Sequence, residues 1–273
     1  MPLSTIRIAT ALVQPDYEWA FQSRLSLVAK MCTWLGHNEP RCRSLTGPAG
    51  YFRVSSQAEA YERRDEFTRA IGDELLTTFT FDLLGDDPSP KKRALDGKHL
   101  ADGHALPFYG CLIDGGKPLG DIVQQLGRKS GDISAFVADA HARHRVHITS
   151  LLENRPVALS LCGEVRSRPW REALVEQTPC LILNPAHASV NLAGNPTRSW
   201  ARHVDELLMK LPQDAAWAFA DHITQLEHRA NKQFVPLVQG GQGTRARRVN
   251  DSGWDIPGAR LYVYEVLLVQ EAG

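Results

Sequence analysis

Two short apolar runs with a helical segment between them constrain the fold of this chain more than any other feature. Val157, Ala158, Leu159 and Leu161 form the first run, and residues 179–185 contain the second between two prolines. Apolar runs of this length are typical of strands that are covered on both faces. Residues 170–177 between them have the pattern of a short helix. Buried strands joined by a helix favour an α/β fold.

The same alternation of strands and helices continues along the chain. The helix predicted at residues 56–76 begins at Ser56, which fits a capping box with Glu59. No internal repeat or low-complexity linker interrupts the pattern, so we expect residues 1–273 to form a single domain. Further strands are predicted at residues 6–14, 75–84, 104–113, 234–238 and 259–269, and further helices at residues 17–35, 200–211 and 214–233.

Charge and composition disfavour several classes of partner. Lys plus Arg and Asp plus Glu number 31 each, whereas a nucleic-acid-binding protein usually carries a basic excess. No apolar run approaches the ~20 residues that cross a bilayer, and the first residues do not resemble a signal peptide. The five cysteines have no paired spacing, which is typical of reduced thiols. We therefore expect no nucleic-acid partner, no membrane and a cytoplasmic location.

Cys162 ends the first apolar run and is the candidate nucleophile. Gly163 follows it and allows a sharp turn, so the cysteine would lie at the end of a strand. Cysteine is also among the most buried residue types, and a core thiol is the alternative. Glu164 is either an acid that works beside the thiol or an acid that the dipole of the following helix favours. His187 follows the second strand at the same edge, either as a substrate contact or as a loop histidine.

Two other groups of residues suggest different chemistry. His141, His144 and His147 recur at every third position, and histidine is the commonest metal ligand, but no nearby cysteine or acid completes a zinc pattern. Residues 240–243 are rich in glycine and precede several arginines, yet they lack the spacing and the Lys-Ser/Thr pair of a phosphate-binding loop. We therefore expect no metal site, and a flexible basic loop at residues 240–248.

Several segments form an ordered set along nearly the whole chain. Residues 161–164 read Leu-Cys-Gly-Glu, and residues 48–52 read Pro-Ala-Gly-Tyr-Phe. The other members of the set are the strand at 6–14, Arg128-Lys129, the strand at 181–185, the helix at 214–233 and the strand at 235–241. In this order, and not one by one, they resemble the motifs of the nitrilase superfamily of carbon–nitrogen hydrolases.

The resemblance implies a four-layer α-β-β-α sandwich and a Glu-Lys-Cys triad. Cys162 would attack the carbon of a small amide, or of a nitrile, and form a thioester acyl-enzyme. Lys129, unless it is a solvated surface lysine, would stabilise the oxyanion. The resemblance also implies no cofactor and a homodimer or larger assembly. The residues expected to contact the substrate are Tyr51, Asn184 and His187.

The sequence departs from that family's pattern at the position of the general base. Ala49 stands where the family has a glutamate, and alanine cannot accept a proton. Another carboxylate would then serve, with Glu164 as the first candidate and Glu39 as a more distant one. Alternatively, the protein keeps the fold, has lost hydrolysis and binds a small molecule or a partner protein. A different alignment of the turn is the third alternative.

Overall fold

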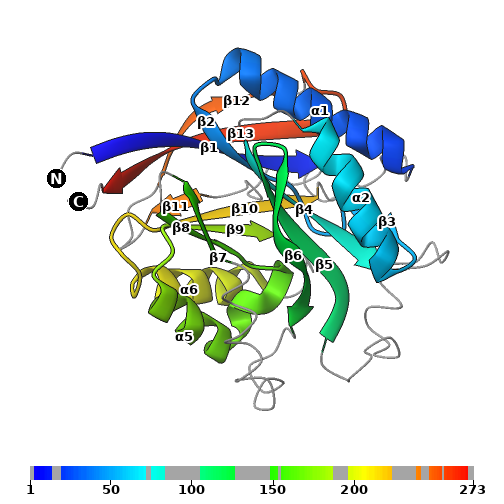
Figure 1. The fold of residues 1–273 in the computed structure, drawn as a ribbon. Coiled ribbons are helices and arrows are strands. Elements are labelled where there is room, and N and C mark those ends of the chain that lie inside the picture. The colour runs from blue at the N-terminus through cyan, green and yellow to red at the C-terminus, as the bar shows by residue number, and fades with distance from the viewer. Residues whose placement is uncertain are drawn as a thin grey trace.

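A computed structural model describes residues 3–13, 20–71, 75–83, 105–126, 148–152, 155–186, 196–222, 238–240, 246–253 and 255–269. Its strands form two layers that face each other, and helices cover the outer side of each layer (Figure 1). The predicted four-layer α-β-β-α sandwich is therefore confirmed.

The first sheet holds the first and the last strands of the chain side by side. β1 pairs antiparallel with β13 along its whole length and runs parallel to β2, which is parallel to β4. β5 and β6 continue the sheet as an antiparallel hairpin. Its strands are β1 (Leu3–Val13), β2 (Cys42–Thr46), β3 (Phe52–Val54), β4 (Leu76–Leu83), β5 (Ala105–Asp114), β6 (Lys117–Leu126), β12 (Arg247–Asp251) and β13 (Ala259–Val269).

The second sheet is built around three parallel strands in the order β10-β9-β8. It joins the first sheet where the ends of β1 and β10 run parallel, with Leu12 beside Asp221 and Val13 beside His222. Its strands are β7 (Ile148–Leu152), β8 (Arg155–Leu159), β9 (Leu181–Pro185), β10 (Ala216–His222) and β11 (Val238–Gly240). The described helices are α1 (Phe21–Asn38), α2 (Gln57–Ala70), the short 3-10 helix η1 (Cys162–Arg166), α5 (Arg168–Gln177) and α6 (Pro196–Leu208).

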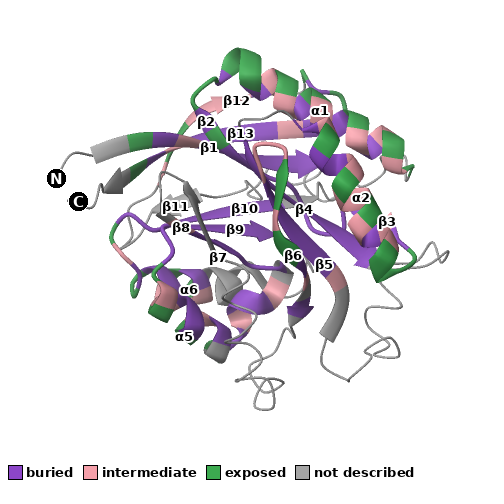
Figure 2. Cartoon of the chain, viewed as in Figure 1, coloured by how far each residue is buried: buried purple, intermediate pink, exposed green. Residues whose placement is uncertain are grey.

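Each strand of the inner layers sends alternate side chains to two different cores, as the period of a strand requires. Even-numbered residues of β1, such as Ile6 and Ile8, face the second sheet and pack with Leu159 and Leu183. The odd-numbered Ala9 and Ala11 face α1 and α2 instead. Figure 2 shows the result, with buried strands in the middle and exposed residues confined mainly to the outer surfaces of the helices.

The helices close the two outer cores. α1 and α2 cover the first sheet with Leu27, Val28 and Phe67, among others. α5 and α6 cover the second sheet, where Trp170 of α5 meets Trp217 of β10 edge-to-face with ring centroids 6.4 Å apart. Burial of such aromatic side chains dominates core stability. None of the described helices is long and apolar enough to cross a membrane.

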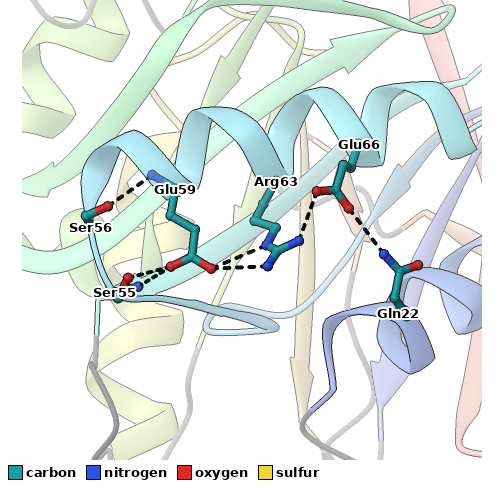
Figure 3. A network of polar contacts seen from close by, with 6 residues as sticks. All are labelled: Gln22, Ser55, Ser56, Glu59, Arg63 and Glu66. Atoms are coloured by element: carbon teal, nitrogen blue, oxygen red, sulfur yellow. Dashed lines mark hydrogen bonds and ion pairs between the residues drawn. The ribbon is translucent and has the colours of Figure 1, made fainter.

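A chain of polar contacts joins α1 to α2 at the surface (Figure 3). Ser56 caps α2 by accepting a hydrogen bond from the Glu59 backbone nitrogen at 3.1 Å. The Glu59 carboxylate accepts from the nitrogen and the hydroxyl of Ser55, each at 2.7 Å. The predicted capping box is thus half formed, because the glutamate reaches Ser55 and not Ser56. Arg63 and Glu66 continue the chain to Gln22 of α1.

The strands predicted with long apolar patterns are confirmed, and β13 has the bounds that the sequence predicts. The predicted helix at 214–233 is wrong in its described part, because residues 216–222 form β10. Alanine has the highest helix propensity, but here Ala216 and Ala218 face the inter-sheet core while Trp217 and Phe219 face the helices. The alternation of small and large side chains fits a central strand, and tertiary burial overrides the propensity.

Other boundaries also differ from the prediction. α1 continues past Gly36 to Asn38, and α2 ends at Ala70. Strand β6 was missed, because its polar sequence lacks a clear pattern. Arg247 and Arg248 were expected in a flexible loop at residues 240–248, but they begin β12, where Arg247 makes a 2.7 Å ion pair with Glu265 of β13. Residues 133–147, with the three histidines, lie outside the described residues.

Candidate active site

The carboxyl ends of several parallel strands meet at one edge of the sandwich. β1, β2 and β4 are parallel within the first sheet, β8, β9 and β10 within the second, and β1 is parallel to β10. Cys162 follows β8, and the turn at residues 47–51 follows β2. Ligands of α/β sheets bind outside such carboxyl ends. This edge, called the carboxyl edge below, is therefore the candidate site.

The backbone around Cys162 is held by hydrogen bonds from both sides. The Ser160 nitrogen donates to the Leu183 oxygen of β9 at 2.9 Å. The Asn184 side-chain amide donates to the Ser160 carbonyl at 2.6 Å. Beyond Ser160 the chain leaves the strand, and Cys162 is the first residue of η1. The predicted position of Cys162 at a strand end is confirmed, while its side chain lies outside the described ones.

Glu164 fixes the turn that carries Cys162. Its carboxylate is fully buried and accepts a hydrogen bond from the Leu161 backbone nitrogen at 2.8 Å. The Glu164 nitrogen in turn donates to the Leu161 oxygen at 3.0 Å. This is the pattern of an acid that caps the first turn of a helix. The geometry therefore gives Glu164 a role in shaping the turn, and its role as a base stays a prediction.

The turn at residues 47–51 brings Ala49 to the same edge. The Ala49 nitrogen donates to the oxygen of Ala186, just after β9, at 3.2 Å. The Gly47 nitrogen donates to the Thr78 oxygen of β4 at 2.8 Å, and Gly50 adopts a φ of 61°, which favours glycine. Ala49 is 2% exposed. The position expected to carry the general base thus lies at the carboxyl edge and holds only a methyl group.

Tyr51 and Asn184 are fully buried supports of this edge. The Tyr51 hydroxyl donates to the Arg24 carbonyl at 3.1 Å, and its ring packs 4.8 Å from that of Phe52 and 5.2 Å from that of Phe79. Arg24 donates back to the Tyr51 carbonyl. These contacts stabilise the fold. Contacts of Tyr51 and Asn184 with a substrate stay predictions. Lys129 and His187 lie outside the described residues.

Glu39 lies at the opposite edge of the first sheet and is excluded as a replacement base. It precedes β2, whereas the candidate turn follows that strand. Its carboxylate accepts hydrogen bonds from Arg7 and, at 2.6 Å, from Asn250. Both partners belong to strands of the same sheet, so this buried acid ties β1 to β12 at the amino ends of the parallel strands.

Sequence reasoning missed Asp82, a carboxylate at the carboxyl edge. It is the second-last residue of β4 and is 2% exposed. Its ladder neighbour on β3 is Arg53. Burial lowers the pKa of the Arg24 guanidinium and Arg53 adds to this effect, while Tyr51 and Asp82 oppose it. A signal existed in the alternation of residues 76–83, where Asp82 continues the face of Thr78 and Thr80.

Three of the other described cysteines are unsuited to nucleophilic chemistry. Cys32, Cys42, Cys111 and Cys180 form no disulfide. Burial raises the pKa of Cys32, Cys42 and Cys111 to about 12, so their thiolate fraction near neutrality is negligible. Among the described residues, no group of three or more histidine, cysteine or acidic residues is arranged to hold a metal ion.

Comparisons with known proteins give a fold but no sequence family. No protein-family model matches the chain, and no curated protein sequence matches it. Similar solved structures include an amidase of the nitrilase superfamily from Nesterenkonia, with a TM-score of 0.54, 13% identity and coverage of 94% of this chain and 90% of that one. Another is Nit3 of Saccharomyces cerevisiae, a member of branch 10 of that superfamily, with a TM-score of 0.56, 10% identity and coverage of 96% and 90%.

A longer enzyme contains the same architecture as one part. The glutamine-dependent NAD(+) synthetase of Cytophaga hutchinsonii matches with a TM-score of 0.55 and 13% identity over 96% of this chain, which spans 43% of the synthetase chain. A glutamate-to-glutamine mutant of the Nesterenkonia amidase has also been solved with the result of Michael addition of acrylamide at its active-site cysteine. Because these structures match nearly the whole of this chain, the chain has the fold of the nitrilase superfamily.

Proposed function

We propose that this protein hydrolyses a carbon–nitrogen bond in a small amide, with Cys162 as the nucleophile. The observation that carries the proposal is the position of Cys162 at the end of β8, on a turn held by Asn184 and Glu164. A rigidly held turn at the carboxyl edge is where an α/β fold presents a reactive side chain. The choice of residue is supported by the amidase with this fold, whose glutamate-to-glutamine mutant carries an acrylamide adduct at the active-site cysteine.

The chemistry follows from the groups assigned. The Cys162 thiolate attacks the amide carbon, and the carbonyl π electrons move to oxygen, where the Lys129 ammonium stabilises the negative charge. The carbon–nitrogen bond then breaks, the nitrogen takes a proton, and the acyl group remains as a thioester. Water, deprotonated by a carboxylate, attacks the thioester and releases the acid and the thiol. A nitrile would follow a related path through attack on its carbon.

The remaining assignments rest on the same resemblance. His187 would contact the substrate from the segment after β9, beside the supports Tyr51 and Asn184. Glu164 is the first candidate for the base, with the limitation that one of its oxygens already accepts from Leu161. We propose that the protein works without a cofactor, in the cytoplasm, as a homodimer or larger assembly. Light scattering on the purified chain measures the assembly directly.

The test of the function is Cys162→Ala. Ammonia release from a panel of aliphatic amides is measured for the wild type, for this variant and for Cys32→Ala, a matched removal of a half-buried thiol on α1. Cys162→Ala should lose at least about 10³-fold in kcat/KM, because nothing else supplies the nucleophile, while Cys32→Ala keeps its turnover. Equal turnover in both variants would remove the hydrolase proposal.

Ala49 supports a second candidate, a nitrilase-fold protein that binds a small molecule or a partner without hydrolysis. The two candidates differ in the reactivity of Cys162. A catalytic thiol reacts with methyl vinyl sulfone, an electrophile that carries no amide, well ahead of Cys32, Cys42 and Cys111, whose pKa burial raises to about 12. Mass spectrometry of labelled peptides measures this order. No preference for Cys162, together with no amide turnover, favours the binding protein.

A further inference from the structure

We propose that Asp82 is the carboxylate that takes the proton of Cys162, in place of the acid that is absent at position 49. The inference rests on the proposed function and adds to it a residue on a strand of the opposite sheet. It rests on three features of Asp82: the face of β4 on which its side chain lies, its burial, and the charged residues around it.

Asp82 points between the two sheets. Leu76 of β4 belongs to the inter-sheet core, whereas Phe79 and Phe81 belong to the core under the helices. Because successive side chains of a strand alternate, Asp82 shares the face of Leu76. The ladder agrees, since Leu112 opposite Thr78 also lies in the inter-sheet core. Asp82 therefore lies on the inter-sheet face of β4, near the carboxyl edge.

Contacts between the sheets bring the end of β4 toward Cys162. Gly110 of β5 is the ladder partner of Thr80. A Cβ built at Gly110 would lie 2.4 Å from a methyl carbon of Leu161, so the Leu161 side chain packs directly against the backbone of β5 here. Asp82 lies two residues beyond Thr80 toward the carboxyl edge, and Cys162 follows Leu161 toward the same edge. Asp82 and Cys162 therefore both lie on the carboxyl-edge side of the contact between Gly110 and Leu161.

The Asp82 side chain is buried, so a negative charge on it needs partners within the protein. An ionised carboxylate is rarely buried unless cations or hydrogen bonds compensate it. Arg53 lies beside it on β3, and Arg24 of α1 is close enough for Asp82 to raise its pKa. Its ladder neighbour on β5, Phe108, carries no charge. The titratable residues that the structure places at this edge also include Glu164 and Cys162 and, at the end of β10, Asp221 and His222, and Lys129 is proposed to join them.

The alternatives are less well placed. Glu39 lies at the opposite edge and binds Arg7 and Asn250. Glu164 is on the same edge but accepts from the backbone nitrogen of the residue that precedes Cys162, a contact that shapes the turn. Asp82 comes from the facing sheet, so a substrate between the sheets would have the thiol on one side and the acid on the other.

The proposed step balances without an additional reactant. The sulfur–hydrogen bond of Cys162 breaks and its proton moves to an Asp82 oxygen, while the sulfur–carbon bond to the amide forms. The same carboxyl group then gives the proton to the leaving nitrogen as the carbon–nitrogen bond breaks. In the second half, it takes a proton from water as the oxygen–carbon bond forms, and returns it to sulfur as the thioester breaks.

The test measures how fast methyl vinyl sulfone, a thiol electrophile with no amide group to hydrolyse, adds to Cys162 between about pH 6 and 9, so that it needs no known substrate. The variants are Asp82→Asn and, as a control, Glu39→Gln, which removes another buried charge from the far edge of the same sheet. At about pH 6.5 we expect Asp82→Asn to label at least about 10-fold more slowly than the control, because the base is lost. Loss of the base also makes the labelling rate follow the titration of an isolated thiol.

The direction of the change in labelling rate distinguishes a base from a mere neighbouring charge. If Asp82 only repelled the thiolate, its removal would lower the pKa of Cys162 and speed up labelling. Faster or unchanged labelling relative to Glu39→Gln therefore overturns the proposal. Asp82→Glu keeps the charge beside Arg53 and serves if the asparagine variant does not fold. It should still label at least about 10-fold more slowly, because the carboxylate is displaced, and wild-type labelling in this variant also overturns the proposal.

The same proteins separate this inference from the proposed function. An enzyme in which Cys162→Ala loses amide turnover but Asp82→Asn keeps it refutes Asp82 alone. A protein without amide turnover in which labelling of Cys162 depends on Asp82 refutes the hydrolase proposal alone.

Discussion

The two edges of the first sheet each bury a carboxylate beside an arginine, yet the two acids have different surroundings. At the amino edge, Glu39 binds Arg7 and Asn250, and all three residues belong to the first sheet or to the segment before β2. At the carboxyl edge, Asp82 lies beside Arg53 and opposite the sheet that carries Cys162. Both acids are thus buried beside an arginine, and they differ in what faces them across the inter-sheet space.

The comparison teaches that the role of a buried acid depends on whether it lies at the amino or the carboxyl ends of the parallel strands. Parallel strands give the two edges different chemistry, because chain connections at the carboxyl edge present turns and side chains to a ligand. An acid at the amino edge can only stabilise the fold. If this interpretation is right, variants at the two edges separate into those that change stability alone and those that also change the reactivity of Cys162.

The largest effect on stability is expected from Glu39→Ala. It leaves Arg7 and Asn250 without their shared acceptor, and the free energy of unfolding should fall by about 2 kcal/mol, less than for a fully buried pair because Arg7 is partly exposed. Urea denaturation measures the loss. The rate of methyl vinyl sulfone addition to Cys162 should not change, and a clear change in that rate would break the comparison between the edges.

Asn184→Ala should have a comparable or smaller effect on stability and a second effect on reactivity. It removes the donor to the Ser160 carbonyl at the base of the Cys162 turn, which costs about 1–2 kcal/mol. The loosened turn should also slow the labelling of Cys162 by several-fold, in contrast to Glu39→Ala. Denaturation and labelling of the same sample give both values, and a loss of stability with unaltered labelling would mean that the turn does not need this support.

The smallest effect is expected at Asp251, an acid on the outer strand β12. Burial raises the pKa of this carboxyl group, but hydrogen bonds from Arg260 and the Gly253 nitrogen outweigh this, and the pKa is lowered. A lowered pKa means that the interaction stabilises the protein above the unfolded value of about 4 and is lost as the pH falls through the folded value. The partly exposed pair contributes at most about 1 kcal/mol.

The corresponding measurement compares wild type and Asp251→Asn by urea denaturation at several pH values. Their stability difference should be constant near neutrality and should shrink below about pH 4. A difference that grows on acidification would show that the ion pair with Arg260 does not lower the pKa. Labelling of Cys162 should be the same in both proteins, since Asp251 lies on an outer strand.

Much of the fold could be predicted from local patterns, and the failures have physical causes. The strands around Leu159 and Leu183 and the whole of β13 have apolar patterns that few other structures accommodate. The segment at Trp217 was predicted as a helix, because alanine favours helices and the period-two alternation of large residues was overlooked. The polar strand β6 has no periodic signal, and its pairing with β5 decides its structure.

The candidate site, like the fold, has features that local sequence predicts and features that only the tertiary structure decides. The sequence by itself determined that Cys162 follows a buried strand, that Glu164 comes two residues later and that Ala49 stands in a turn, because strand ends, turns and residue identities are local properties. Only the tertiary structure decided that Glu39 and Asp82 lie at opposite edges, and that Gly110 lets β5 approach Leu161. The physical reason is that strand order and direction arise from pairing between distant segments, and that pairing determines which acids come together with a thiol.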